Sequence, residues 1–261
     1  QHTWLRRQRQ MCIRDSITGG SRGVGADLAK LCAEKGWNMT ITCSNSIDDA
    51  KNVAKECEKL GSEVLVLQAD VSLDKDCEET VSKTIEKWGR LDSLVNNAGK
   101  TKFNAHHNLE GLSSDDFIDL YSTNTVGPYQ MIKYAKDHLM KAESPSIVNI
   151  ASIAGVMGIG SSVAYAASKG ALINMTKSLA RALGPIRINA ICPGFIQGDW
   201  LRGGLGDEAY ELTKKSIEDM APLSLTCTPR QVAETTFHFM TESVTVTGET
   251  LILDGGMHLG R

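Results

Sequence analysis

The segment Thr18–Gly25 reads TGGSRGVG, with glycines at positions 19, 23 and 25 in the spacing G-x-x-x-G-x-G. Glycines at this spacing let a backbone turn tightly and approach a pyrophosphate, which then lies at the N-terminus of the following helix. The segment therefore predicts a dinucleotide-binding turn between the first strand and the first helix of a parallel sheet. Because glycine turns are common, the prediction depends on what surrounds this one.

Downstream of the turn, short apolar runs alternate with segments of helical apolar spacing. The predicted strands cover residues 38–43, 63–70, 91–99, 146–152, 186–194 and 249–256. The predicted helices cover residues 26–36, 47–61, 74–89, 114–141, 164–183 and 229–240. Together with the strand that leads into the turn, this order predicts a single α/β domain. We expect a Rossmann-type, doubly wound, seven-stranded parallel sheet with its ligand at the carboxyl ends of the strands.

Composition narrows the classes of partner. The 261 residues carry a formal net charge of −3, and 41% of them are hydrophobic. This is not the basic footprint of a nucleic-acid-binding protein, and no apolar stretch approaches the roughly 18 residues of a membrane span. We therefore expect a cytoplasmic protein with neither nucleic acid nor membrane as a partner. The seven cysteines lack CxxC or His-paired spacing, so we predict reduced packing thiols and no metal site.

Three residues have the chemistry of proton transfer to a carbonyl. Tyr165 and Lys169 are four residues apart, so a helix brings them onto one face, where an ammonium favours the phenolate. The ammonium is needed because an unperturbed tyrosine has a pKa of about 10, too high for a proton acceptor near neutral pH. Ser152 follows a predicted strand, where its hydroxyl can hold a substrate oxygen facing Tyr165. An isolated Tyr-x-x-x-Lys pair is more often a solvated helix face.

Further sequences at the predicted strand and helix ends strengthen the pattern. They are ADV at 69–71, NNAG at 96–99, YAASK at 165–169 and PG at 193–194. With the glycine turn, they resemble the short-chain dehydrogenase/reductase family from Ile17 onward. The resemblance implies a catalytic set in which Asn124 anchors a water leading to Lys169. It also implies that Ser152 polarises a carbonyl and that Tyr165 transfers the proton.

The resemblance implies a nicotinamide cofactor, and one feature of the sequence favours NADP(H) over NAD(H). The second predicted strand ends at Cys43 and Ser44, where an acidic residue would bind the ribose 2′-hydroxyl of NAD(H), and Arg22 is placed to meet a 2′-phosphate. The alternative is that Arg22 is a surface charge and that Asp48 or Asp49 reaches the ribose. The implied cofactor-binding residues are Gly19, Gly20, Ser21, Arg22, Gly23, Val24, Gly25, Ser44, Asp70, Val71, Asn97, Ala98, Gly99, Tyr165, Lys169, Pro193, Gly194 and Ile196.

The nearest resemblance is to 3-oxoacyl-acyl-carrier-protein reductases, which use NADPH to reduce a β-keto group. Those enzymes present arginines to the acidic carrier protein, whereas this chain has Gln130 and the pair Gly184 and Pro185 at the matching positions. Arg187 lies nearby but begins a predicted strand. An acyl carrier protein is therefore in doubt as a partner, and a free ketone, keto ester, sugar or steroid stays open as the carbonyl or alcohol substrate.

Two further expectations follow from the resemblance. It implies a homo-oligomer, a tetramer or dimer, built on the predicted helices 114–141 and 164–183, with the C-terminal strand at a second interface. The alternative to an enzyme is a non-catalytic dinucleotide sensor. Residues 197–216, QGDWLRGGLGDEAYELTKKS, are glycine-rich and follow a strand end, so they are either a substrate lid or an ordinary surface loop with a helix.

The residues before the glycine turn do not fit a buried strand. Arg6–Ser16 reads RRQRQMCIRDS and back-translates, codon by codon, to a transposase-type sequencing-library adapter in frame with the following residues. We therefore interpret residues 1–16 as an assembly artefact that replaces the start of the first strand, and residues 17–261 as the NAD(P)-binding domain. The competing interpretation is a basic arm. A central strand that carries Arg14 and Asp15 is expected to lose several kcal/mol of stability, because burying unpaired charge is costly.

Overall fold

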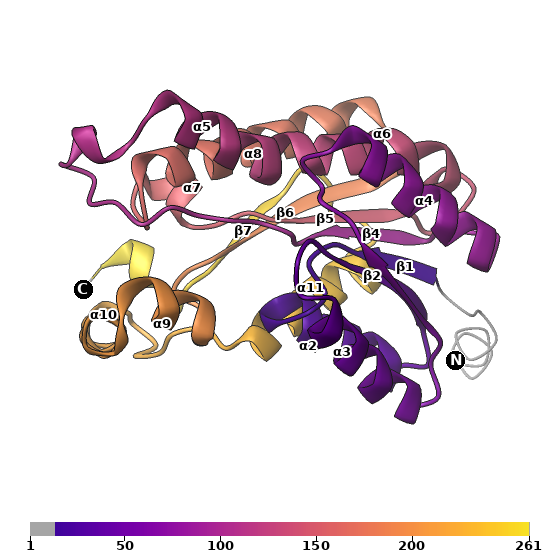
Figure 1. Ribbon diagram of the computed structural model, residues 1–261, viewed down its shortest axis with the longest axis horizontal. Coiled ribbons are helices and arrows are strands. Elements are labelled where there is room, and N and C mark those ends of the chain that lie inside the picture. The colour runs from indigo at the N-terminus through magenta and orange to yellow at the C-terminus, as the bar shows by residue number, and fades with distance from the viewer. Residues whose placement is uncertain (1–13, 261) are drawn as a thin grey trace.

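The computed structural model describes residues 14–260. They form one parallel sheet with the strand order β3-β2-β1-β4-β5-β6-β7 and helices on both faces (Figure 1). The predicted seven-stranded, Rossmann-type α/β domain is confirmed. The strands are β1 Arg14–Ile17, β2 Asn38–Cys43, β3 Val64–Gln68, β4 Ser93–Asn96, β5 Ser146–Ile150, β6 Arg187–Pro193 and β7 Thr250–Leu253.

Helices cover the sheet in two layers. Figure 1 shows α2, α3 and α11 below the sheet and α4, α5, α6 and α8 above it. The first layer consists of α2 Gly23–Glu34, α3 Ile47–Lys59 and α11 Pro229–Thr241. The second consists of α4 Asp74–Trp88, α5 Ser114–Tyr121, α6 Gly127–Leu139, α7 Ala154–Met157 and α8 Val163–Ala182. The connection from β6 to α11 holds α9 Asp199–Leu205 and α10 Asp207–Met220. None of the helices in residues 14–260 has the length and apolar character needed to cross a bilayer.

The strands read as unbroken apolar runs because both faces of the sheet are buried. In β4 and β5, Val95 and Val148 face the core beneath α2 and α11, whereas their neighbours Leu94 and Ile147 face the core beneath α4 and α6. Successive side chains of a strand point to opposite faces, so a sheet covered on both sides needs apolar residues at every position. The six cysteines within residues 14–260 are buried and free, as packing thiols would be, and Cys12 lies outside the described residues.

The predicted helix over 114–141 is not continuous. It is broken into α5 and α6 by a π-helical turn, η2, at Ser122–Val126. Gly127, the first residue of α6, packs closely on the segment that follows β3. A Cβ on Gly127 would lie 2.8 Å from the Val71 side chain. Pro128 follows in the first turn of α6, where a missing N–H is tolerated. The extra residue of the turn places Asn124 inward, fully buried.

The first strand carries a buried charge. Asp15 is completely buried in β1, paired in register with Met39 of β2 and Ser93 of β4. Neither carboxylate oxygen has a hydrogen bond of ordinary geometry to a described residue. Burial raises the pKa of Asp15 well above its usual value, nearby Asp92 raises it further, and Ser93 and Arg14 only oppose the rise. This burial supports the proposal that Arg6–Ser16 is not native sequence, although residues 1–13 lie outside the described residues.

We predict that Asp15→Val raises the free energy of unfolding by about 2–4 kcal/mol, because the substitution removes an uncompensated buried charge. In the present chain, the native state binds the proton of the Asp15 carboxyl group more tightly than the unfolded state does. Stability should therefore fall as pH rises from the unfolded pKa of about 4 towards the native pKa, and stay level above it. Urea unfolding between pH 4 and pH 8 measures both effects. Asp15→Asn is the matched control, and a pH slope that survives in it would contradict the assignment.

Candidate active site

The glycine turn is shaped by close backbone packing. Gly19 and Gly23 have φ values of +68° and +55°, in the left-handed region that favours glycine. A Cβ on Gly25 would lie 2.3 Å from the carbonyl oxygen of Gly19, so only glycine fits where α2 crosses the turn. α2 begins at Gly23, so its first N–H groups face the space above the turn. The local geometry is that of an anion-binding helix N-terminus.

Hydrogen bonds fasten this turn to the neighbouring strand. The Thr18 hydroxyl accepts from the backbone N–H groups of Asn97 and Ala98, each at 3.0 Å. The Asn97 side-chain amide donates in return to the carbonyl oxygens of Thr18 and Gly19, also at 3.0 Å. β1 and β4 are adjacent parallel strands, but the strand that follows β1 lies on one side of this pair and the strand that follows β4 lies on the other. The turn therefore lies at the topological switch point of the sheet.

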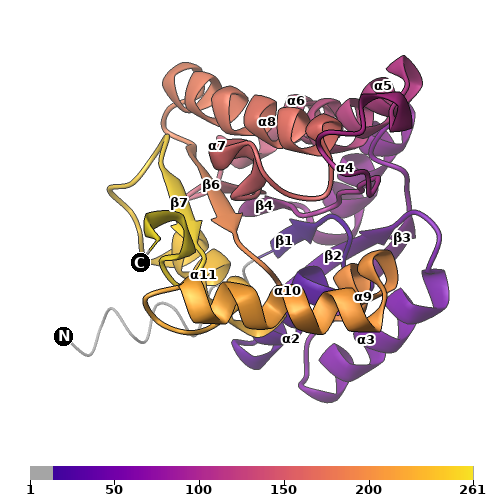
Figure 2. The ribbon, with the colours of Figure 1, turned by 90° about the vertical axis from the view of Figure 1, so that its left-hand side faces the viewer.

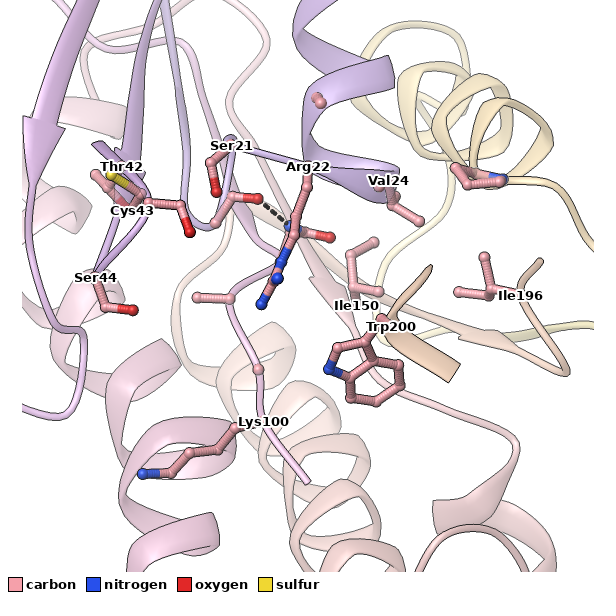
Figure 3. A pocket seen from close by; sticks show the side chains of 18 of the residues that line it. Ser21, Arg22, Val24, Thr42, Cys43, Ser44, Lys100, Ile150, Ile196 and Trp200 are labelled. Atoms are coloured by element: carbon pink, nitrogen blue, oxygen red, sulfur yellow. Dashed lines mark hydrogen bonds between the residues drawn. The ribbon is translucent and has the colours of Figure 1, made fainter. Parts of the chain in front are cut away.

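A cavity of about 830 Å³ opens at this point. In Figure 3, Ser21, Thr42, Cys43 and Ser44 form one side and Ile150, Ile196 and Trp200 the other, with Arg22 between them. Fourteen of the predicted cofactor residues line it: Gly19, Ser21, Arg22, Gly23, Val24, Ser44, Asp70, Val71, Asn97, Ala98, Gly99, Tyr165, Lys169 and Ile196. The lining also includes residues that the sequence analysis did not single out: Lys30, Thr42, Asn45, Ser46, Thr101, Ile150, Gln197 and Trp200.

Four predicted cofactor residues are not part of this lining: Gly20, Gly25, Pro193 and Gly194. The three glycines among them permit close packing behind the residues that line the cavity. A Cβ on Gly20 would lie 2.7 Å from the Cβ of Ile41, and one on Gly194 would lie 2.7 Å from the Cβ of Asp254. Strand-end glycines are therefore required here even where they do not face the cavity.

The predicted catalytic residues Ser152, Tyr165 and Lys169 come together, and Tyr165 and Lys169 line the cavity whereas Ser152 lies beside it. Ser162 caps α8 by accepting a hydrogen bond from the Tyr165 N–H at 3.2 Å, which sets the first turn of the helix. One turn later, the Lys169 ammonium lies 5.9 Å from the centre of the Tyr165 ring and donates to the Ile150 carbonyl oxygen at 2.8 Å. Ser152, beyond the end of β5, accepts from the Ala154 N–H at 3.1 Å and lies close enough to the Tyr165 side chain to oppose the rise of its pKa.

Burial controls the protonation of this group. It raises the pKa of Tyr165 to about 12, against the opposing hydrogen bond from Ser152. It also lowers the pKa of Lys169 to about 8, because the side chain is almost fully enclosed. Burial thus makes the Tyr165 phenol a weaker acid than an unperturbed tyrosine, and the expected role of Lys169 in favouring the phenolate stays a prediction.

Asn124 joins the cluster through a loop. Its side-chain oxygen accepts from the Lys100 N–H at 2.9 Å, and its amide donates to the Lys100 carbonyl oxygen at 2.9 Å and to the Ser168 hydroxyl at 3.0 Å. A Cβ on Gly99 would lie 3.2 Å from the Asn124 oxygen and 3.4 Å from the Lys169 nitrogen. Asn124 thus holds the loop after β4 against α8 beside Lys169, and its predicted water-anchoring role stays a prediction.

The far end of the cavity is polar. Cys43, Ser44 and Arg22 line it, and Arg22 is exposed at the N-cap of α2. Neither Asp48 nor Asp49 is among the lining residues, and the Asp48 side chain, 90% exposed, faces Lys51. The thiol of Cys43 is buried, which raises its pKa, so it behaves as a neutral packing group.

Comparisons with known proteins agree with this geometry. A sequence profile described as "Enoyl-(Acyl carrier protein) reductase" matches residues 19–258. The chain is 36% identical over 244 residues to the 3-oxoacyl-acyl-carrier-protein reductase FabG of Chlamydia pneumoniae, which spans 92% of this chain and 95% of that protein. The chain belongs to the short-chain dehydrogenase/reductase family. As a member of that family, it is an NAD(P)-dependent oxidoreductase that acts on CH–OH groups or the corresponding carbonyls.

Solved structures of this short-chain dehydrogenase/reductase family superimpose closely. A family member from Burkholderia xenovorans is 33% identical and gives a TM-score of 0.88, covering 96% of this chain and 100% of its own. NAD⁺-bound xylitol dehydrogenase is 25% identical and gives a TM-score of 0.86, covering 94% of this chain and 98% of its own.

We predict that Thr18→Val destabilises the fold by about 1–3 kcal/mol and weakens nucleotide binding, because two N–H groups at the end of β4 lose their acceptor. Thr42→Val is the matched control: Thr42 is equally buried, but its hydroxyl has no hydrogen-bond partner among the described residues. Urea unfolding of both variants tests the assignment, together with cofactor titration of Thr18→Val. Equal losses of stability in the two variants would show that the Thr18 hydroxyl does not fasten the turn.

Proposed function

We propose that this enzyme reduces a ketone or β-keto group with NADPH and that Tyr165 provides the proton. The observation that carries the proposal is the placing of the Tyr165 phenol in the cavity lining, with the Lys169 ammonium 5.9 Å from its ring centre and Ser152 beside it. A reductase needs a proton donor at this position, whereas a dehydrogenase needs an acceptor. The similarity to the 3-oxoacyl-acyl-carrier-protein reductase of Chlamydia pneumoniae supports the same direction.

The roles of the side chains follow from their positions. When bound, NADPH supplies a hydride to the carbonyl carbon. Ser152 holds the carbonyl oxygen, and the Tyr165 hydroxyl transfers its proton to that oxygen as the C=O π bond is lost, leaving an alcohol and NADP⁺. Lys169, whose pKa of about 8 keeps it charged at neutral pH, stabilises the tyrosinate that remains.

The preference for NADPH over NADH is supported by the polar end of the cavity. No acidic residue stands at Cys43 or Ser44, the end of β2, where a carboxylate would repel a 2′-phosphate. Arg22 and Lys30 both line this end, and Lys30 also pairs with Glu56 at 2.7 Å. The fit of a dinucleotide rests on the glycine cradle, in which a Cβ on Gly25 would strike the turn.

The structure favours a free substrate over one carried by an acyl carrier protein. Gln130 is buried, and its amide donates to the Val71 carbonyl oxygen at 2.8 Å, so this position does not face a partner. Arg187 is buried too, with its guanidinium donating to the carbonyl oxygens of Phe239 and Met240 at the end of α11. Neither position presents a cation to an acidic protein.

We also propose a homo-oligomer, a tetramer or dimer built on α5, α6 and α8. Several large apolar side chains of α5 and α6 are exposed in the single chain: Phe117, Ile118, Tyr121 and Tyr129. Exposed large apolar side chains on neighbouring helices are typical of a protein contact. α5 packs on α8, so one apolar surface would lie beside the catalytic helix.

We predict that Tyr165→Phe lowers ketone reduction by at least about 100-fold while NADPH still binds, because only the transferable proton is removed. Tyr129→Phe, on the exposed side of α6, is the matched control and should retain full activity. NADPH oxidation followed by absorbance measures turnover, and NADPH fluorescence measures binding. Turnover that persists in Tyr165→Phe would exclude the mechanism, and a wild-type protein that binds NADPH but reduces no ketone would favour the non-catalytic sensor.

We predict that Arg22→Ala raises the Kd for NADPH by about tenfold or more and leaves the Kd for NADH within about twofold, because a charge-assisted hydrogen bond contributes about 1.5–3 kcal/mol. Lys35→Ala, also exposed but beyond the C-terminal end of α2, is the control. Fluorescence titration with each cofactor measures the difference. Equal weakening of both cofactors, or tighter NADH binding by the wild type, would reject the assignment of NADPH.

A further inference from the structure

An aromatic side chain from α9 stands beside the catalytic phenol. The Trp200 ring lies 6.4 Å from the Tyr165 ring, centre to centre, at an interplanar angle of 53°. Trp200 lines the cavity and is 42% exposed, so part of its face stays open to a ligand. Figure 3 shows its indole at the edge of the cavity near Ile150. The segment that carries it, left open by the sequence as lid or surface loop, forms the two helices α9 and α10 across the end of the sheet (Figure 2).

The position of α9 is set by a contact with the loop that follows β4. The Phe103 ring lies 6.4 Å from the Trp200 ring and packs directly on Gly204. A Cβ on Gly204 would lie 1.9 Å from a carbon of the Phe103 ring, so only glycine permits this approach. The adjacent Gly203 has no atom within 4 Å of its Cβ position. Phe103 therefore positions α9 through its contact with Gly204, and it positions Trp200 because Trp200 belongs to the same helix.

The charges on this segment do not favour an anionic substrate, because Asp199 lines the cavity and the basic residues are paired. α9 and α10, which lie wholly within the described residues, contain three basic residues, and each pairs with a carboxylate. Arg202 pairs with Asp207 at 2.8 Å and with Glu211 at 2.6 Å. The other two pairs are Lys214 with Glu218 and Lys215 with Asp219. Because these basic side chains already pair with carboxylates, the Trp200 ring is the group of this segment that we expect to contact a substrate beside Tyr165.

We propose that Trp200 is a specificity-determining residue, seated by Phe103 against Gly204, and that it selects neutral ketones with a flat ring next to the reacting carbonyl. The inference rests on the proposed carbonyl reduction. The carbonyl oxygen would meet the hydroxyls of Ser152 and Tyr165, and a substituent that extends from the phenol towards the indole would then contact the Trp200 ring. Aromatic rings attract one another in offset or edge-on pairs at 4.5–7 Å between centres, a range that includes the separation of these two side chains.

The first test compares two β-keto esters that differ only in one substituent, ethyl benzoylacetate and ethyl acetoacetate, with NADPH as reductant. In Trp200→Ala we expect kcat/KM for the phenyl ketone to fall about fivefold or more, mainly through KM, while the value for the methyl ketone stays within about twofold. Trp200→Phe keeps an aromatic face and should retain most of the preference. Thermal unfolding of both variants checks that the fold is retained.

The second test uses the glycine pair of α9. Gly204→Ala should lower the preference for the phenyl ketone as Trp200→Ala does, because the added methyl group displaces Phe103 from α9. Gly203→Ala adds the same methyl group to the same helix in open space, so it should keep the wild-type preference. A loss of preference in both variants would mean that helix stability, not the Phe103 contact, positions Trp200, and would overturn that part of the inference.

The outcomes separate this inference from the proposed function. If the wild type reduces both ketones but Trp200→Ala lowers both values of kcat/KM equally, Trp200 is not a specificity residue and the inference fails alone. If the wild type binds NADPH and reduces neither ketone nor any other carbonyl compound, the proposed function fails and the inference fails with it. A wild type that prefers the methyl ketone also overturns the inference while leaving carbonyl reduction intact.

Discussion

The hydroxyl of Thr18 joins the two strands on which the site depends. It accepts from two consecutive N–H groups at the end of β4, and Asn97 returns two hydrogen bonds to the end of β1. These strands are parallel neighbours whose pairing ends at Ile17 and Val95, so the Thr18 and Asn97 side chains extend the link from the sheet into the glycine turn and the β4 loop. The link fixes one wall of the cavity against the other, and Asn124 extends it from the β4 loop to α8.

Burial then decides the chemistry of α8. Removing water disfavours the charged form of both Tyr165 and Lys169, which moves their pKa values apart, to about 12 and about 8. At neutral pH the pair is still a neutral phenol beside an ammonium, which is the state for giving a proton and stabilising the anion left behind. In the proposed reduction, the phenol would give the proton and the lysine would stabilise the anion left behind.

The sequence predicts most of the sheet because parallel strands buried on both faces must be apolar throughout. The prediction for residues 38–43 coincides with β2, and all seven strands are present. What it missed depends on contacts between distant residues. The apolar period of 114–141 is the same for a continuous helix and for one with a π turn, and only the packing of Gly127 on Val71 distinguishes them. Likewise, spacing cannot tell that Gly20 and Gly194 face Ile41 and Asp254 rather than the cavity.

The buried charge of β1 and the catalytic group lie at opposite ends of the sheet. Asp15 is paired with Ser93, the first residue of β4, whereas the cavity begins beyond the last residues of these parallel strands. The strain of an uncompensated carboxylate therefore acts on the amino-terminal edge, and the hydrogen bonds of Thr18 lie between it and the glycine turn. Burying Asp15 lowers the free energy of unfolding, which is a property of the whole domain. The geometry around Tyr165 is set by α8, β5 and the β4 loop. Stability and activity are separable in this chain for that reason.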